Sequence, residues 1–206
     1  MDGKFRRKIF RPNKINDMRK VILFMHMSLD GFIAKTNGEM DWVTREDMEM
    51  NNYLIGDLLT TVDTMLLGRT LYQGFQQAWP AIATTPGMPK ELVDFAHWIE
   101  DSPKYVFSKS LNKLDWKNSF LLKGNVAEEV KKLQQQPGKD IVVFGGSGIA
   151  QQLAKENLID EYRIKLEPFF LGTGKPLFKD VAKLKLIQSK AFSSGVVGLY
   201  YQPEKK

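Results

Sequence analysis

Apolar and polar residues change their spacing repeatedly along the chain, and the changes predict alternating strands and helices. Residues 20–28 are almost continuously apolar, which is typical of a strand buried on both faces of a sheet. In residues 44–60 the apolar positions fall near one helical face, with Thr44 as the expected N-cap and Asp47 three residues later. The same reasoning predicts further strands at 32–35, 62–67, 104–107, 119–122 and 140–144, and further helices at 69–79, 90–100, 126–135 and 149–156.

The last part of the chain is expected to be β-structure. Strands are predicted at 161–168, 184–191 and 196–202, with residues 192–195 joining the last two as a hairpin. Residues 80–90, which contain three prolines, are expected to form a loop. The pattern predicts an α/β fold: a mostly parallel central sheet with an antiparallel C-terminal β-hairpin and helices on both faces. Since neither a linker nor a repeat interrupts it, residues 18–206 are expected to form one domain.

The positive charge of the chain is concentrated at its start. The formal net charge is +6, from 30 Lys and Arg against 24 Asp and Glu, and residues 1–20 carry eight of the basic and two of the acidic side chains. We therefore interpret residues 1–17 as a disordered basic leader and residues 21–206, with 22 basic and 22 acidic side chains, as a formally neutral body. A neutral body lacks the basic face of a phosphate-backbone binder, so no nucleic-acid partner is expected, except for a weak alternative in which the leader makes that contact.

Residue counts exclude several classes of site. The absence of cysteine excludes disulfides and thiolate metal or redox sites, and two histidines are too few for a multi-histidine zinc site, so no metal is expected. The apolar run 21–27 is too short to span a bilayer and has no signal-peptide cleavage pattern. We expect a soluble, cytoplasmic protein with no membrane partner.

Three predicted strand ends carry residues suited to a phosphate-bearing ligand. Residues 144–149 pass from a buried strand through glycines into a helix, residues 66–70 place Arg69 at a helix start, and residues 106–110 place two hydroxyls around Lys109. Ligands of such sheets bind beyond the carboxyl ends of the strands, where helix-start N–H groups attract anions. Each segment also has an ordinary structural interpretation: a tight turn capped by Ser147, a solvated Arg69, and a polar turn.

Taken in order, these segments and three others resemble one known family. The segments are 28–34 (SLDGFIA), 68–72 (GRTLY), 105–108 (YVFS), 144–147 (FGGS), 158–161 (LIDE) and 168–178 (PFFLGTGKPLF). They are similar to the reductase domain at the C-terminal end of bifunctional riboflavin-biosynthesis proteins, within the dihydrofolate-reductase-like superfamily. The resemblance covers about residues 18–203 and implies that superfamily's fold.

The resemblance implies NADPH as the cofactor. The glycine turn would hold the pyrophosphate, the segments at Arg69 and Ser108 would flank the adenosine 2′-phosphate, and the stretch from His26 to Ile33 would hold the nicotinamide. One departure is that Leu71 and Gln73 replace the Thr and Glu of the family pattern. The implied cofactor-binding residues are His26, Ile33, Gly68, Arg69, Thr70, Ser108, Lys109, Gly145, Gly146, Ser147, Gly148 and Ile149.

The proton donor and the substrate contacts are left with alternatives. Trp42 and Asp47 have the spacing of the tryptophan and carboxylate that handle the substrate in dihydrofolate reductases, but Asp47 also suits a helix cap. Asp30 is the other candidate acid, against a simple Asp-Gly turn. Lys175 is a candidate for a substrate phosphate or for a turn at a dimer edge. His26 is interpreted as a core or pocket-wall residue rather than a base.

The sequence therefore predicts an NADPH-dependent reductase that transfers hydride to a small heterocyclic or sugar-derived substrate. By resemblance, the nearest activity is reduction of 5-amino-6-(5-phosphoribosylamino)uracil in riboflavin biosynthesis. The alternatives are a dihydrofolate or pteridine reductase and a nucleotide-binding module without catalysis. The C-terminal hairpin edge and the family also favour a homodimer.

Overall fold

The structure is a computed structural model and describes residues 18–45, 47–178 and 180–204, so the predicted leader lies outside the described residues. Strands and helices alternate along most of these segments. The strands are β1 (Val21–Ser28), β2 (Phe32–Ala34), β3 (Val62–Gly68), β4 (Lys104–Phe107), β5 (Ser119–Leu122), β6 (Asp140–Val143), β7 (Glu161–Glu167), β8 (Lys175–Pro176), β9 (Leu184–Ala191) and β10 (Val197–Pro203). The helices are α1 (Met48–Thr61), α2 (Arg69–Thr84), α3 (Lys90–Asp101), α4 (Val126–Gln134) and α5 (Ser147–Lys155).

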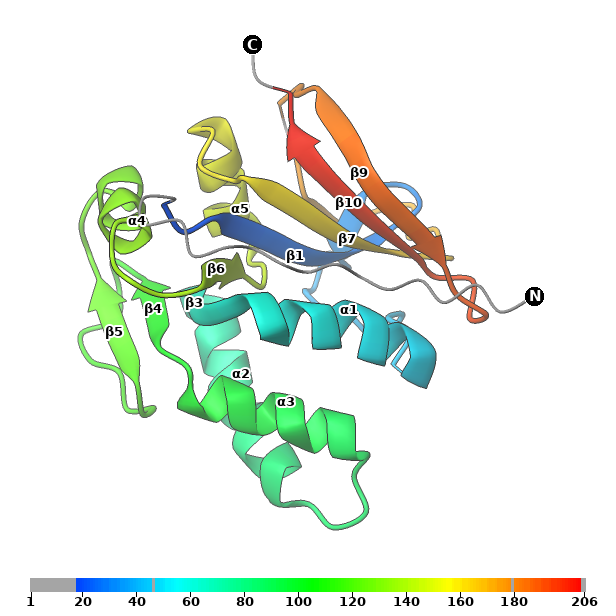
Figure 1. Cartoon of the computed structure of the whole chain (residues 1–206), viewed down its shortest axis with the longest axis horizontal. Helices are drawn as coiled ribbons and strands as arrows, with labels where there is room; N and C mark the ends of the chain where they lie inside the picture. Colours follow the sequence, from blue (N-terminus) through cyan, green and yellow to red (C-terminus); the bar gives the residue numbers. More distant parts are fainter. Residues whose placement is uncertain (1–17, 46, 179, 205–206) are drawn as a thin grey trace.

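One large sheet has the strand order β5-β4-β3-β6-β1-β7-β10-β9, and β2 and β8 pair separately. The first six strands of this order, β5, β4, β3, β6, β1 and β7, are parallel to one another. Strands β10 and β9 are antiparallel to their neighbours. Helices α4 and α5 cover one face of the sheet and α1, α2 and α3 cover the other (Figure 1). The predicted α/β fold class, including its antiparallel C-terminal hairpin, is confirmed.

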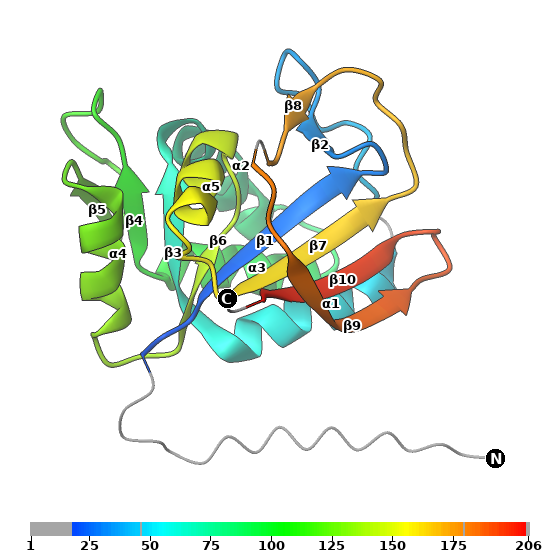
Figure 2. The same cartoon turned by 90° about the horizontal axis from the view of Figure 1, so that it is seen from above.

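Strand β1 lies inside the sheet, between β6 and β7. Val21, Ile22 and Leu23 are fully buried, as expected from the continuous apolar run, because α-helices cover both faces of the sheet here. The parallel strands have their carboxyl ends at one edge of the sheet, and β2 and β8 lie beyond the ends of β1 and β7 (Figure 2). Within the described residues, no helix is both long and apolar enough to cross a membrane.

Helix α1 begins later than predicted. The Asp47 carboxylate accepts a hydrogen bond from the backbone N–H of Met50 at 2.9 Å, so Asp47 is the N-cap and the expected cap, Thr44, lies outside the helix. The Thr44 backbone N–H instead donates to Glu167 at 3.1 Å. The prediction that Thr44 caps the helix is therefore wrong, because the residue is held by a long-range contact.

Helix α2 ends later than predicted, because it continues through Pro80 to Thr84. Proline inside a helix removes one N–H donor and costs about 3 kcal/mol. Aromatic packing keeps this part of the helix in place: the Trp79 ring meets Phe95 of α3 edge-on at 5.0 Å between centroids. The loop predicted at 80–90 is accordingly shorter.

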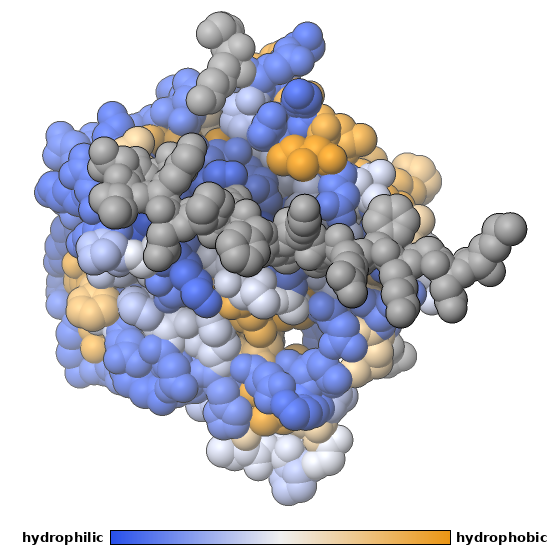
Figure 3. All heavy atoms as spheres, in the orientation of Figure 1, coloured by the Kyte–Doolittle hydropathy of each residue, from blue (hydrophilic) through white to orange (hydrophobic). Residues whose placement is uncertain are grey.

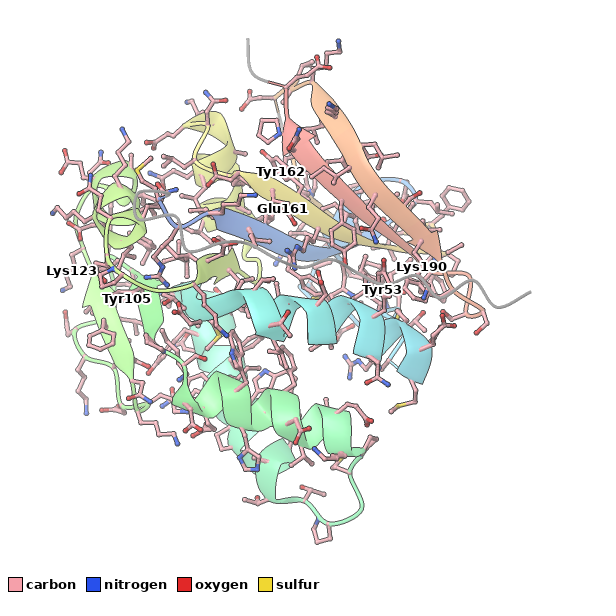
Figure 4. All side chains as sticks on the ribbon, viewed as in Figure 1. Tyr53, Tyr105, Lys123, Glu161, Tyr162 and Lys190 are labelled. Carbon is pink, nitrogen blue, oxygen red and sulfur yellow. The ribbon has the colours of Figure 1, made fainter. Side chains whose placement is uncertain are left out.

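Strand β9 forms one edge of the large sheet and is attached to α1 by a cation and aromatic rings. The Lys190 ammonium lies 4.2 Å from the centroid of the Tyr53 ring and 2.8 Å from the Glu49 carboxylate (Figure 4).

Figure 3 shows apolar surface over β9 and β10, and Leu186 and Ile187 are each about half exposed. The homodimer favoured by the sequence stays a prediction.

Lys104, at the start of β4, is a fully buried cation. Its ammonium donates hydrogen bonds to the carbonyls of Glu100 and Ser102 at 3.0 and 2.9 Å and lies over the Trp116 ring. Burial lowers the pKa of Lys104 to about 8. The contribution of this residue to stability therefore depends on pH.

Because the Lys104 pKa is about 10.4 in an unfolded chain, the unfolded state binds the extra proton between the two values and stability rises with pH there. We expect the unfolding free energy of the wild type, minus that of Lys104→Met, to increase by about 2 kcal/mol between about pH 7 and 10. Urea unfolding of both proteins at the two pH values measures this difference. A difference independent of pH would contradict the lowered pKa.

Candidate active site

A cleft of about 680 Å³ opens where the carboxyl ends of β1, β3, β4, β5 and β6 meet, and β2 and β8 contribute to its wall. This is the edge at which the sequence places the cofactor. Apart from Gly145, every residue implied for cofactor binding lines the cleft: His26, Ile33, Gly68, Arg69, Thr70, Ser108, Lys109, Gly146, Ser147, Gly148 and Ile149. The topology thus brings together residues that are up to 123 positions apart in the chain.

The glycine turn after β6 exposes the start of α5 to the cleft. Gly145 and Gly146 have φ angles of +115° and +82°, which side-chain-bearing residues rarely adopt, and Gly146 is the N-cap of the helix. A Cβ on Gly145 would lie 3.1 Å from the Met25 sulfur. The first N–H groups of a helix have no partner within the helix and carry partial positive charge, so this turn is suited to an anion such as a pyrophosphate.

Basic and hydroxyl side chains gather at the ends of β3 and β4. The Arg69 guanidinium donates to Ser110 Oγ at 3.0 Å, and Ser108 Oγ accepts the Leu111 backbone N–H at 3.0 Å. Lys109 lines the cleft beside them. Among the described residues Arg69 has a neutral serine and no carboxylate as its partner, so this group of side chains can bind a phosphate.

The charged side chains that line the cleft are all basic: Arg69, Lys109, Lys123 and Lys175. No aspartate or glutamate is present among the described residues that form its wall. Lys175 belongs to β8, at the β2 end of the cleft, whereas the other three cations follow β3, β4 and β5. The cleft is therefore positive at both ends and suited to ligands that carry more than one phosphate.

A buried ionic cluster lies behind the cleft wall at β1. Glu167 is fully buried, and its Oε1 lies 3.0 Å from His26 Nδ1 while its Oε2 accepts the Thr44 N–H. Lys165, which is also buried, lies 3.4 Å from the same carboxylate and donates to the Thr44 carbonyl. The register explains the contact, because His26 and Lys165 are paired neighbours in β1 and β7.

The pKa values of this cluster follow from burial and charge. Burial lowers the pKa of the His26 imidazole, and the hydrogen bond to Glu167 offsets only part of that effect. Burial would raise the pKa of Glu167, but the His26 hydrogen bond, the Lys165 charge and the Thr44 N–H together hold the pKa below its usual value. Burial also lowers the pKa of Lys165. The expected state near neutral pH is a neutral His26 facing an ionised Glu167.

The two acidic candidates of the sequence have other partners. Asp47 accepts the Ser194 hydroxyl at 2.5 Å as well as the Met50 N–H, and these hydrogen bonds lower its pKa and favour the ionised carboxylate. Asp30 accepts the Ser28 hydroxyl and the Gly172 N–H, at 2.6 and 2.7 Å, and its pKa is lowered too. Neither lines the cleft, and their acid role stays a prediction.

The two other substrate candidates differ in position. Trp42 is buried outside the cleft wall, and its indole N–H has no hydrogen-bond partner among the described residues. Lys175 lines the cleft, and its ammonium lies 3.1 Å from the position a Cβ would take on Gly38. The structure thus brings Lys175, but not Trp42, to the predicted cofactor residues. Leu71, the departure from the family pattern, also lines the cleft.

Sequence reasoning missed two features of the site. Lys123 follows β5 (Figure 4) and lines the cleft, and the strand-end argument used for Ser108 would have found it at this fourth strand end. Glu167 lies in the segment 161–168, for which the sequence predicts a strand and no buried ionic contact. The alternation of Arg163, Lys165 and Glu167 in a strand with buried neighbours was the available signal, since charges on one face of an interior strand must pair.

The residues present fit a phosphorylated dinucleotide, since a helix start lies between two groups of cations and glycines keep Cβ atoms away from it. Fold and cleft together define a dihydrofolate-reductase-like α/β protein. The chain belongs to the RibD C-terminal domain family, which matches residues 19–198. The family resemblance implied by the sequence motifs is confirmed.

Similar proteins agree with this assignment. The chain is 38% identical over 187 residues to YyaP, an uncharacterized protein of Bacillus subtilis (strain 168), covering 89% of this chain and 94% of that protein. A deaminase/5-amino-6-(5-phosphoribosylamino)uracil reductase structure from Thermotoga maritima superposes with a TM-score of 0.63 at 17% identity, over 91% of this chain and 57% of that one. Dihydrofolate reductase from Enterococcus faecalis, complexed with NADP(H), gives a TM-score of 0.60 at 14% identity, over 90% and 97%.

Proposed function

We propose that this protein is an NADPH-dependent reductase that transfers hydride to a small, phosphorylated heterocyclic or sugar-derived substrate. The single observation that carries the proposal is the cleft itself: a helix start and four basic side chains converge in it, in a chain of the RibD C-terminal domain family. NADPH carries two anionic groups, a pyrophosphate and a 2′-phosphate, which the positive groups of the cleft would complement.

The chain's residues divide into three groups in this proposal. The N–H groups at the start of α5, from Ser147 and Gly148, bind the pyrophosphate. Arg69, Ser108 and Lys109 bind the 2′-phosphate, which distinguishes NADPH from NADH. His26 and Ile33 line the nicotinamide end of the cleft. When bound, NADPH supplies the hydride, and the protein positions it and excludes water.

Lys175 supports a phosphorylated substrate. It lies at the β2 end of the cleft, across the sheet from the three cations assigned to the cofactor end. A ribosyl phosphate would complement this charge, whereas dihydrofolate carries carboxylates instead. The preferred substrate class is therefore that of 5-amino-6-(5-phosphoribosylamino)uracil, with dihydrofolate or another pteridine as the second candidate.

Turnover assays test this function. NADPH oxidation, followed by nicotinamide absorbance, is expected with 5-amino-6-(5-phosphoribosylamino)uracil as the probe. Oxidation with dihydrofolate alone would favour the second candidate. NADPH binding without oxidation by either probe would leave the nucleotide-binding module as the better description and contradict the reductase.

Replacing Arg69 by alanine tests the 2′-phosphate assignment. We expect the Kd for NADPH to rise about tenfold or more, because a charge-assisted hydrogen bond contributes roughly 1.5–3 kcal/mol, and the Kd for NADH to change little. Titration by nicotinamide fluorescence measures both constants. His97→Gln is a suitable control, because His97 is exposed and lies outside the cleft wall. Equal weakening of NADPH and NADH binding would contradict the assignment.

A further inference from the structure

His26 is the titratable side chain of the cleft wall that has a buried carboxylate behind it. Its side chain is 27% exposed, while the Glu167 side chain that faces Nδ1 is 0% exposed. The imidazole therefore has exposed surface that the contact with Glu167 does not cover, and Nε2 is its nitrogen outside that contact. In the part of the chain that the structure describes, Nε2 has no hydrogen-bond partner and is not buried.

The cluster fixes which nitrogen of His26 carries the proton. An ionised Glu167 can only accept hydrogen bonds, so the 3.0 Å contact requires a proton on Nδ1. Glu167 cannot turn away, because Thr44 and Lys165 hold its two oxygens. Neutral His26 thus presents the Nε2 lone pair to the cleft, and protonated His26 presents an Nε2–H donor there.

We propose that His26 is the proton donor of the reaction, with Glu167 as the positioning residue that holds its ring; this inference rests on the proposed function. The arrangement suits substrates in which the carbon that accepts hydride is doubly bonded to oxygen or nitrogen, with that heteroatom directed at Nε2. It assigns the proton to a residue of the cleft wall, whereas Asp47 and Asp30 are engaged elsewhere.

The reaction balances with the groups named. The substrate carbon gains hydride, with its electron pair, from C4 of the dihydronicotinamide, and the π bond of the C=O or C=N group breaks. The heteroatom takes the Nε2 proton, so the substrate is reduced, the nicotinamide is oxidised and His26 becomes neutral. A proton taken up from the solvent then restores the protonated Nε2, so that each turnover consumes one hydride and one proton. The ion pair of Glu167 with imidazolium stabilises the protonated form that this step consumes.

The charged groups around His26 set the expected pH dependence. Glu167 favours the imidazolium, whereas burial, Lys165 of β7 and Arg45 of the segment before α1 disfavour it. Turnover should fall as pH rises above the His26 pKa. Glu167→Gln removes the favourable charge and should move this fall to lower pH, while Lys165→Met removes an unfavourable charge and should move it to higher pH. A purely structural role predicts no such opposite displacements.

Histidine NMR tests the inference without turnover, because His26 and His97 are the chain's two histidines and His97 is an exposed internal control. In long-range proton–nitrogen spectra near neutral pH, we expect His26 to be protonated at Nδ1 alone, and saturating NADPH to shift the His26 signals but not those of His97. An Nε2–H tautomer, or NADPH binding seen by fluorescence without a response of His26, would overturn the inference while leaving the proposed function intact. Absence of NADPH binding would overturn both.

A matched pair of variants tests the same role by kinetics. His26→Gln retains hydrogen-bonding capacity but cannot supply a proton, so we expect kcat to fall about 100-fold or more with the Kd for NADPH within about threefold of wild type, and the pH-dependent fall to disappear. His97→Gln should leave both constants unchanged. A kcat for His26→Gln within about threefold of wild type, or an unchanged pH profile, would overturn the assignment.

Discussion

Gly146→Ala is expected to destabilise the fold by about 1–3 kcal/mol and to weaken NADPH binding at least tenfold, which is among the largest effects a one-carbon change can have in this chain. Space is not the cause, because the nearest atom to the added Cβ would be Ile149 Cγ2 at an ordinary 3.6 Å. The cause is the backbone: φ +82° and ψ 104° lie outside the regions that alanine populates. The turn must change its shape, and this displaces the first N–H groups of α5 from the anion site proposed there.

Gly148→Ala is the matched control for this prediction. Gly148 lies in the first turn of α5, and its φ is outside the left-handed region that favours glycine. Nothing lies within 4 Å of the added Cβ. Alanine there is expected to leave the fold as stable as wild type or up to about 1 kcal/mol more stable. Urea unfolding compares the stability of both variants, and the NADPH titration of Gly146→Ala is compared with the wild type, because Gly148 is itself assigned to the pyrophosphate. Equal stability of Gly146→Ala and Gly148→Ala would contradict the role given to the turn.

Glu167→Ala is expected to cost about 3–5 kcal/mol of unfolding free energy, the largest loss of stability expected from a single side chain of the site. The substitution leaves Lys165 buried without its carboxylate and removes the acceptor of the Thr44 N–H and of His26 Nδ1. Adding Lys165→Met to the same chain should restore part of the loss, because the unpaired buried charge is then removed. Urea unfolding of the wild type, both single variants and the double variant measures this coupling.

Acid titration tests whether the Glu167 carboxylate is ionised in the folded state and stabilises it. Because the pKa of Glu167 is lowered in the folded state, its stabilising contribution is present above the usual glutamate range and is lost as pH falls through and below about 4.3. Glu167→Gln lacks this titration, so its stability should fall less steeply on acidification than that of the wild type. Parallel acid dependence of the two proteins, or additive losses in the double variant, would contradict the ionised buried pair.

Sequence patterns predicted the elements that carry the cleft because local rules determine them. The glycine turn into α5 and the Gly68-Arg69 step into α2 are short-range signals, and parallel strands necessarily bring their carboxyl ends to one edge. The same rule places Ser108 there, and it would have placed Lys123 there as well. Short-range chemistry, applied at each strand end, therefore gives most of the residues proposed to bind the cofactor.

The features that the sequence did not reveal depend on long-range pairing. Thr44 lies outside α1 because of its contact with Glu167, a residue 123 positions away. The pairing of β2 with β8, which brings Lys175 to the cleft, depends on a register that no local pattern specifies. The His26–Glu167 contact likewise needs β1 and β7 to be neighbours. These interactions place Lys175 and orient His26, the residues proposed for the substrate and the proton, so local sequence patterns do not identify the proton donor.

Titration of the purified wild-type chain with NADPH, followed by nicotinamide fluorescence and repeated with NADH, tests most directly whether this cleft is a dinucleotide site. The expected result is saturable NADPH binding with a Kd below about 1 mM and at least tenfold weaker binding of NADH, because Arg69, Ser108 and Lys109, which line the cleft, are proposed to bind the 2′-phosphate. No binding of either nucleotide in this range would contradict the proposed function and, with it, the role of His26.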